Sequence, residues 1–176
     1  ANSILPPRID GYNHSMALPY SYNPVKAKEY MKKAGYPNGK GLPTIKYDVR
    51  NASTEARQMG EFIRSELKKI GVNVKVIVNT FPGFLKKSRE GNLQFWQDGW
   101  AMDYPDSENV LQLLIEKNHP PGPNSTYYSN PKFDSLFNKL RLTSNDRDKS
   151  ELMVNMENII QKDLPWIMQY YARNYI

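Results

Sequence analysis

A valine at every second position over 72–78 constrains the fold of this chain more than any other feature. These positions are Val72, Val74, Val76 and Val78, and all four side chains are β-branched. A branched side chain at every second position predicts a strand with one buried face. Because Gly71 is a typical helix terminator, the pattern also places a helix directly before this strand.

Strand and helix patterns alternate on both sides of this segment. An alternating run over 44–49 predicts an earlier strand, and apolar residues at three- and four-residue spacing predict a helix over about 54–70. A short helix is expected over 81–90 and a third strand over 93–97. Short links between such elements favour stacked βα units. The predicted fold class is therefore α/β or α+β.

Helix-start signals recur outside these units. Asn23-Pro24 and Asn130-Pro131 each join a good N-cap to a residue favoured at the first helical position, so a helix should follow both. Further helices are expected over 107–116 and, as the last and longest, over about 145–164. The segment 166–171 is predicted to be a strand.

Length and composition indicate a globular protein. The 176 residues suit one domain or one lobe of a larger protein, and we expect a single domain over residues 1–176. Hydrophobic residues make up 39% and charged residues 24%, which argues against a disordered chain. Without cysteine the chain has no disulfides and no thiolate chemistry.

A net charge of +6 raises the alternative of a nucleic-acid-binding module. Such a module would gather its lysines on one face, with aromatic residues between them. Here the lysine pairs Lys32-Lys33, Lys68-Lys69 and Lys86-Lys87 instead fall near the ends of predicted helices, where cations favour the helix dipole. Solvated helix ends are the preferred interpretation, and no nucleic-acid partner is expected.

The sequence offers little for metal or covalent chemistry. The two histidines, His14 and His119, lie in irregular segments without partners at ligand spacing, so neither a metal nor a cofactor is expected. Asp103 and Asp106 could form an acid and base pair of a hydrolase. Asp106, however, directly precedes a predicted helix, where an acid is usually a cap.

The stretch DGWAMDYPD at 98–106 is the strongest candidate for a binding site. Asp103 lies between Trp100 and Tyr104 just after a predicted strand, and in open α/β sheets ligands collect at the carboxyl ends of strands. A carboxylate among aromatic rings can hold an ammonium group by a charge-assisted hydrogen bond and a cation–π contact. An acid in a surface turn between two core aromatics explains the same residues, and both interpretations stay open on these grounds.

Six short motifs, in order along the chain, point to one family. They read PPRIDGY (6–12), YNPVKAK (22–28), AGYPNG (34–39), LKKIGVNV (67–74), GWAMDYPD (99–106) and YSNPKFD (128–134). On these motifs the chain resembles the C-terminal half of family 5 extracellular solute-binding proteins, the oligopeptide- and dipeptide-binding components of ABC transporters. The resemblance runs through nearly the whole chain, and the motif at 22–39 is its most specific part.

This resemblance implies a binding protein of two lobes that close over the ligand, with this chain as one lobe. Its fold would be a mixed sheet flanked by helices. The implied partners are a small peptide or other small solute, the membrane permease of the transporter, and a second lobe of the same protein. The implied location is periplasmic or extracellular, either free or lipid-anchored, and no catalysis is expected.

The resemblance also assigns roles to residues. Asp103 corresponds to the acid that pairs with the ligand's α-amino group, with Trp100 and Tyr104 beside it. Arg50 corresponds to an arginine that binds the ligand carboxylate in some dipeptide-binding members, although a solvated charge at a strand end is the preferred interpretation of this residue. Nickel complexes, oligosaccharides, opines and haem are alternative ligands in this family, and a hydrolase using Asp103 and Asp106 is the less favoured alternative.

Overall fold

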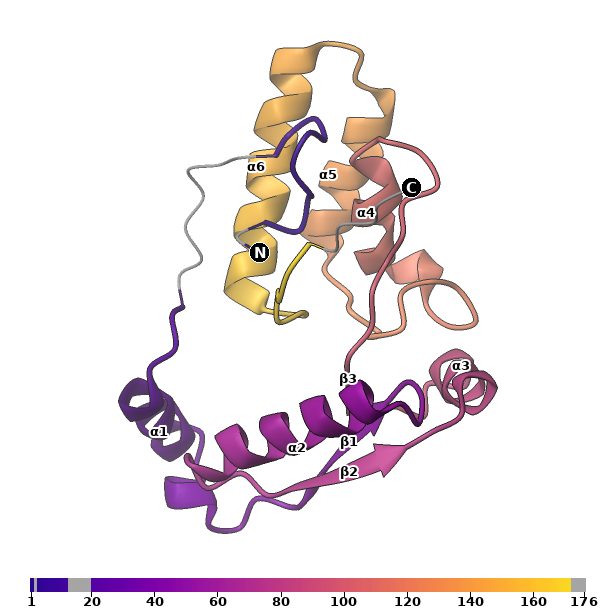
Figure 1. The fold of residues 1–176 in the computed structure, drawn as a ribbon. Coiled ribbons are helices and arrows are strands. Elements are labelled where there is room, and N and C mark those ends of the chain that lie inside the picture. The colour runs from indigo at the N-terminus through magenta and orange to yellow at the C-terminus, as the bar shows by residue number, and fades with distance from the viewer. Residues whose placement is uncertain (2, 13–19, 172–176) are drawn as a thin grey trace. The chain divides into compact units, whose positions relative to one another are not determined.

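The computed structural model describes residues 1, 3–12 and 20–171, which belong to two compact units (Figure 1). A sheet unit covers residues 21–99, and a helical unit joins residues 1–20 to residues 100–176. The division into two compact units does not test the expectation of a single domain over residues 1–176, which stays a prediction. No helix of the described residues has the length and apolar character needed to cross a membrane.

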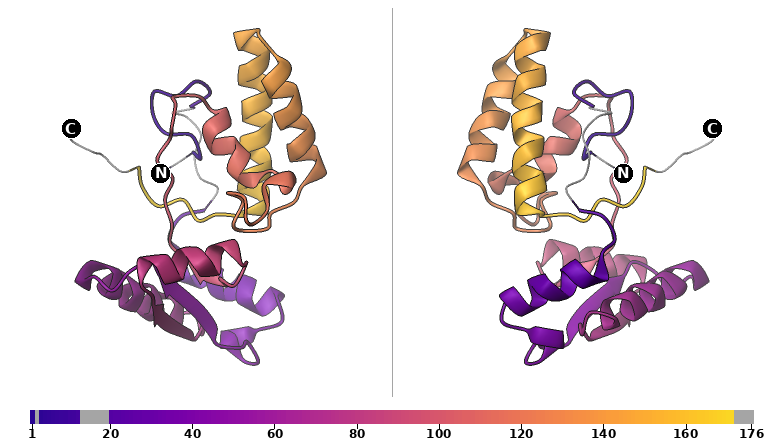
Figure 2. Two further views of the ribbon diagram at one scale, coloured as in Figure 1. Left: turned by 90° about the vertical axis from the view of Figure 1, so that its right-hand side faces the viewer. Right: turned by 90° about the vertical axis from the view of Figure 1, so that its left-hand side faces the viewer.

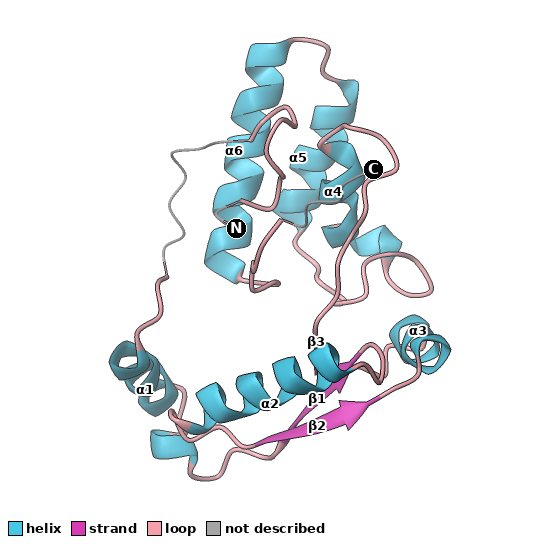
Figure 3. Cartoon of the chain, viewed as in Figure 1, coloured by secondary structure: helices cyan, strands magenta, loops and turns pink. Residues whose placement is uncertain are grey.

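The sheet unit is built from two consecutive βαβ crossovers (Figure 3). Its elements are α1 (Pro24–Lys33), η1 (Pro37–Gly39), β1 (Ile45–Val49), α2 (Thr54–Lys68), β2 (Val74–Val78), α3 (Phe81–Arg89) and β3 (Phe95–Trp96). The strand order is β2-β1-β3, and both strand pairs are parallel. The α/β class is confirmed, but the described strands do not form the mixed sheet that was predicted. A helix in each connection carries the chain back to the same end of the sheet, which makes neighbouring strands parallel.

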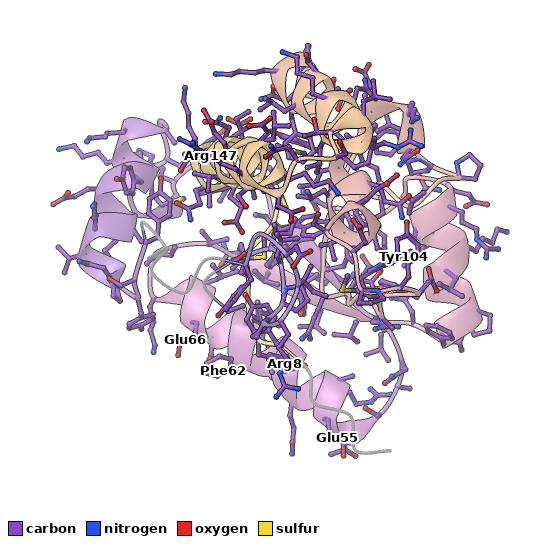
Figure 4. All side chains as sticks on the ribbon, turned by 90° about the horizontal axis from the view of Figure 1, so that it is seen from above. Arg8, Glu55, Phe62, Glu66, Tyr104 and Arg147 are labelled. Atoms are coloured by element: carbon purple, nitrogen blue, oxygen red, sulfur yellow. The ribbon has the colours of Figure 1, made fainter. Side chains whose placement is uncertain are left out.

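One apolar layer joins α2 to the sheet. Tyr47, Val49, Val72 and Val74 are buried, and Ile63 and Leu67 of α2 pack against them. Gly60 lies where the helix comes nearest the sheet, since a Cβ added there would stand 2.7 Å from Val76 Cγ1. Phe62 of α2, by contrast, exposes 57% of its surface and is labelled in Figure 4.

The helical unit contains α4 (Glu108–Leu111), two short 3-10 helices, η2 (Gln112–Leu114) and η3 (Glu116–Asn118), and the longer α5 (Pro131–Leu142) and α6 (Asp146–Asp163). Helices α5 and α6 lie side by side in every view (Figures 1 and 2). The core between the helices is apolar, and its completely buried members are Leu5, Leu111, Leu114, Phe133 and Met156. The single helix expected over 107–116 is divided between α4 and the 3-10 turns.

The strand predicted over 166–171 does not form in the structure. This segment runs beside the first residues of the chain, but it lacks a backbone ladder with them. The Tyr171 hydroxyl donates to Ser3 O at 2.8 Å, and the amino terminus of Ala1 donates to Gln169 O at 2.6 Å. The two segments are therefore joined by a side-chain hydroxyl and an amino terminus, and not by the backbone hydrogen bonds that would pair two strands.

A buried carboxyl group holds the N-terminal segment against α6. Glu157 is only 2% exposed and accepts a hydrogen bond from the Ser3 hydroxyl. Burial raises the pKa of Glu157, while hydrogen bonds from Ser3 and from the backbone of Ile4 and Leu5 lower it by less. The folded state thus favours the protonated form of this group.

This pKa predicts how stability depends on pH. Because the folded pKa lies above the unfolded value, the stabilisation by Glu157 is complete below the unfolded pKa and is lost as pH rises through the folded one. From about pH 4 to about pH 8, we expect the free energy of unfolding of the wild type to fall relative to that of Glu157→Gln. Urea unfolding at both ends of this range measures the difference. Glu151→Gln, at an exposed position of α6, is the control, and parallel pH profiles of wild type and Glu157→Gln would contradict the assignment.

Candidate functional site

The loop that carries the predicted ligand contacts follows β3 and leads into α4. Trp100 is fixed by its indole N–H, which donates to Asn109 Oδ1 at 2.7 Å, and Asn109 is completely buried. Trp100 nevertheless exposes 45% of its surface, and Tyr104, which is labelled in Figure 4, exposes 46%. The loop therefore combines an exposed aromatic ring with an anchor that restricts its orientation.

The two acids of this loop differ in what they bind. Asp106 Oδ1 accepts from the backbone N–H of Glu108, the first residue of α4, at 2.8 Å. The N-cap position itself is Ser107, so Asp106 binds the start of α4 from one residue before the predicted cap position. Asp103 is exposed, and within the described residues its carboxylate has neither a hydrogen bond nor an ion pair. Asp103 is thus free to accept from a ligand donor, while Asp106 is already used by the backbone.

Two hollows in the surface of the helical unit lie apart from the residues predicted to bind ligand. One, of about 460 Å³, is formed by α5, α6 and the turn between them. The other, of about 370 Å³, lies among Asp106, Arg141 and Met153. Trp100, Asp103 and Tyr104 line neither hollow, and all three residues are exposed.

Arg50 directly follows β1 at the carboxyl end of the parallel sheet. Its Nη1 lies 3.3 Å from Asp98 Oδ1, and its guanidinium carbon lies 5.3 Å from the centre of the Phe81 ring. The Arg50 and Asp98 side chains are 39% and 41% exposed. The predicted carboxylate-binding residue therefore already has an internal carboxylate partner.

The sequence analysis did not identify a polar cluster at this same end of the sheet. Asp48 is 3% exposed, and its Oδ1 accepts from Lys87 Nζ at 2.7 Å and from Asn79 Nδ2 at 3.0 Å. Asn79 also donates to Val49 O at 3.0 Å. Asp48 falls on the polar side of the alternating strand, together with Lys46, so the sequence pattern did not distinguish it from an exposed residue.

Among the described residues, no three His, Asp or Glu side chains are placed together so that they could hold a metal ion. The His119 Nε2 atom lies 2.9 Å from Tyr128 O, in a local contact of the polar loop. His14 falls outside the described residues.

Comparison with known proteins gives a consistent set of relatives. The family model described as bacterial extracellular solute-binding proteins, family 5 Middle, matches residues 1–121. Heme-binding protein A of Haemophilus influenzae is 30% identical over 168 residues, which is 95% of this chain and 30% of that protein. Glutathione-binding protein GsiB of Escherichia coli O6:K15:H31 is 30% identical over 174 residues, covering 95% of this chain and 33% of that protein.

Solved structures agree with these sequence relatives. The periplasmic binding protein DppA of Helicobacter pylori, in complex with the peptide STSA, superposes with a TM-score of 0.84 at 32% identity, covering 94% of this chain and 32% of that one. A dipeptide-binding protein of Pseudoalteromonas sp. SM9913, in complex with Met-Leu, gives a TM-score of 0.82 at 28% identity, with 94% and 33% covered. The chain spans about a third of the length of each of these relatives.

Proposed function

This chain belongs to the bacterial extracellular solute-binding proteins of family 5, and from that premise we propose that it is one ligand-binding lobe of a longer protein. The longer protein would capture a small solute outside the cytoplasmic membrane and deliver it to the permease of an ABC transporter. The fraction of each relative that the chain covers, about a third, supports the assignment as a lobe. Binding by closure of two lobes is a common mechanism of ligand capture.

The proposed ligand is a peptide, or another solute with a free amino group, that binds through Asp103. The observation that carries this proposal is the contrast between Asp103, whose carboxylate is unpaired in the described structure, and Asp106, whose carboxylate accepts from the backbone N–H of Glu108. A free carboxylate close in sequence to an exposed, anchored indole suits an ammonium group. Two of the related structures contain peptides, which supports this class, while the haem- and glutathione-binding relatives give the alternatives.

Calorimetry with the full-length protein tests this assignment. A library of short peptides should bind with its amino groups free and should lose affinity when they are acetylated. Asp103→Asn should weaken binding of the free peptides by about 10- to 100-fold, since a hydrogen bond to a charged group contributes about 1.5–3 kcal/mol. Binding of the acetylated peptides should change little.

Asp106→Asn is the matched control, because it removes one negative charge three residues away and keeps an oxygen that can cap α4. The account predicts that this variant binds like the wild type. Equal losses of affinity in both variants would show that Asp103 acts only through its negative charge and not through a direct contact with the ligand's amino group. Turnover of a peptide or glycoside that Asp103→Asn abolishes would instead support the hydrolase alternative.

The 176-residue chain alone should bind such peptides weakly. A single lobe makes only part of the contacts and still pays the full entropic cost of association. Binding by the chain as tight as that of the full-length protein would contradict its assignment as half of a site.

A further inference from the structure

The register of the parallel sheet brings Arg50 and Asp98 together. In the pairing of β1 with β3, Asp48 lies opposite Trp96. Continuing this register by two residues, beyond the ends of both strands, places Arg50 opposite Asp98. Side chains two residues apart along a strand share a face, so the 3.3 Å ion pair follows from the strand pairing.

Both partners are held from other directions as well. The backbone N–H of Gly99 donates to Asp98 Oδ1 at 2.8 Å, the same oxygen that faces Arg50. On the other side, the guanidinium lies over the ring of Phe81, the first residue of α3, at 5.3 Å. The carboxylate thus has a backbone anchor and the guanidinium has an aromatic support.

We propose that Asp98 acts as an internal substitute for a ligand carboxylate and thereby sets the specificity of Arg50. This inference rests on the proposed function, together with the role that the family resemblance implies for Arg50 as a contact for a ligand's carboxylate. A guanidinium has five N–H donors, and the ion pair with Asp98 directs one of its nitrogens toward a carboxylate of the protein itself. A ligand carboxylate must therefore share Arg50 with Asp98 or displace Asp98 from it. A ligand without a carboxylate does not compete with Asp98, so its affinity depends little on this ion pair.

The exposure of the pair determines the size of this effect. With about two-fifths of each side chain in solvent, the pair belongs to the class of surface ion pairs, whose strength is small and reduced by salt. An added carboxylate can compete with a partner of this strength. Removing the charge of Asp98 should therefore increase the preference for carboxylates by a few-fold rather than by orders of magnitude.

The first test measures Arg50 itself and needs no knowledge of the natural ligand. Acetate is titrated into the 176-residue chain while the Nε–Hε signal of Arg50 is followed by NMR. In the wild type we expect a shift that saturates only at high acetate concentration. In Asp98→Asn, which keeps an oxygen to accept from Gly99, we expect a saturable shift with an affinity about two- to fivefold higher. Equal responses in the two proteins would overturn the proposal.

Glu61→Gln is the matched control. Glu61 pairs with Arg64 on the exposed surface of α2, so this variant raises the net charge by the same amount without touching Arg50. The proposal requires the Arg50 signal of Glu61→Gln to respond to acetate as in the wild type. A gain equal to that of Asp98→Asn would assign the effect to net charge and contradict the proposal.

A second test uses the full-length protein and peptides with a free or amidated carboxyl terminus. The wild type should bind both forms with affinities within about twofold, and Asp98→Asn should favour the free carboxylate by about two- to fivefold. An unchanged ratio would reject the role of Asp98. Failure of the proposed function would give a different result. In that case, acetylation of the peptide's amino terminus would not change its affinity for the protein.

Discussion

Replacing Gly71 by alanine is expected to destabilise the sheet unit by about 2–5 kcal/mol. Gly71 ends α2 with a φ of +88°, a conformation that side chains other than glycine rarely adopt. A Cβ at this position would stand 2.2 Å from Asn38 O and 2.7 Å from Gly39 N. The obstructing atoms belong to the backbone, so the η1 turn itself would have to move.

Gly35→Ala is a closely matched control for this prediction. Gly35 ends α1 with a φ of +90°, and a Cβ there meets nothing within 4 Å. The same hydrogen-bond pattern closes both helices, with Tyr36 N donating to Met31 O and Val72 N to Leu67 O. Gly35→Ala should therefore cost only the conformational strain of about 1–2 kcal/mol. Urea unfolding gives both values, and equal losses would show that the contact with η1 contributes nothing.

The second large effect is expected for Asp48→Ala, at about 3 kcal/mol. This change leaves the Lys87 ammonium and the Asn79 amide without their shared carboxylate. Breaking a buried ion pair by removing one partner costs about 3–5 kcal/mol. The lower end applies here because 35% of the Lys87 side chain remains in solvent.

Neighbouring Lys86 provides the comparison. It lies on the same helix, 3.9 Å from Glu90, with side-chain exposures of 75% and 47%. Glu90→Ala should cost less than about 0.5 kcal/mol, as is usual for an exposed pair four residues apart. Adding Lys87→Met to Asp48→Ala should recover part of the lost stability, since it removes the unpaired charge. A loss for Asp48→Ala no larger than that for Glu90→Ala would contradict the assignment of a buried pair.

Elements specified by neighbouring residues could be predicted from the sequence. Asn23 and Asn130 cap α1 and α5 through their side chains, as their Asn-Pro pairs predicted, and Ser53 caps α2. These interactions lie within a few residues of one another. They therefore leave a pattern in the sequence that does not depend on the rest of the fold.

Features that depend on distant partners were predicted poorly. The third strand was expected over 93–97 but is paired only at Phe95 and Trp96, because its length depends on its alignment with β1. Lys87 was assigned to a solvated helix end, yet its partner Asp48 lies 39 residues away. Asp48 itself fell on the polar side of the predicted strand, and no local pattern showed that Lys87 would reach it.

The candidate site divides in the same way. The position of Asp106 before a helix predicted a contact with the helix start, and it accepts from the backbone N–H of Glu108, although the N-cap position itself is Ser107. The pairing of Arg50 with Asp98 required the sheet register and could not be predicted from the sequence. The ligand contacts of Asp103, Trp100, Tyr104 and Arg50 stay predictions, since they depend on a molecule that the sequence does not specify.

The most direct test of the central claim is the structure of the full-length protein, purified from its host, with the ligand it retains. The account predicts a solute with a free amino group whose nitrogen lies about 2.8 Å from a carboxylate oxygen of Asp103. A retained ligand without an amino group, or one whose amino group binds elsewhere while Asp103 stays in solvent, would contradict it.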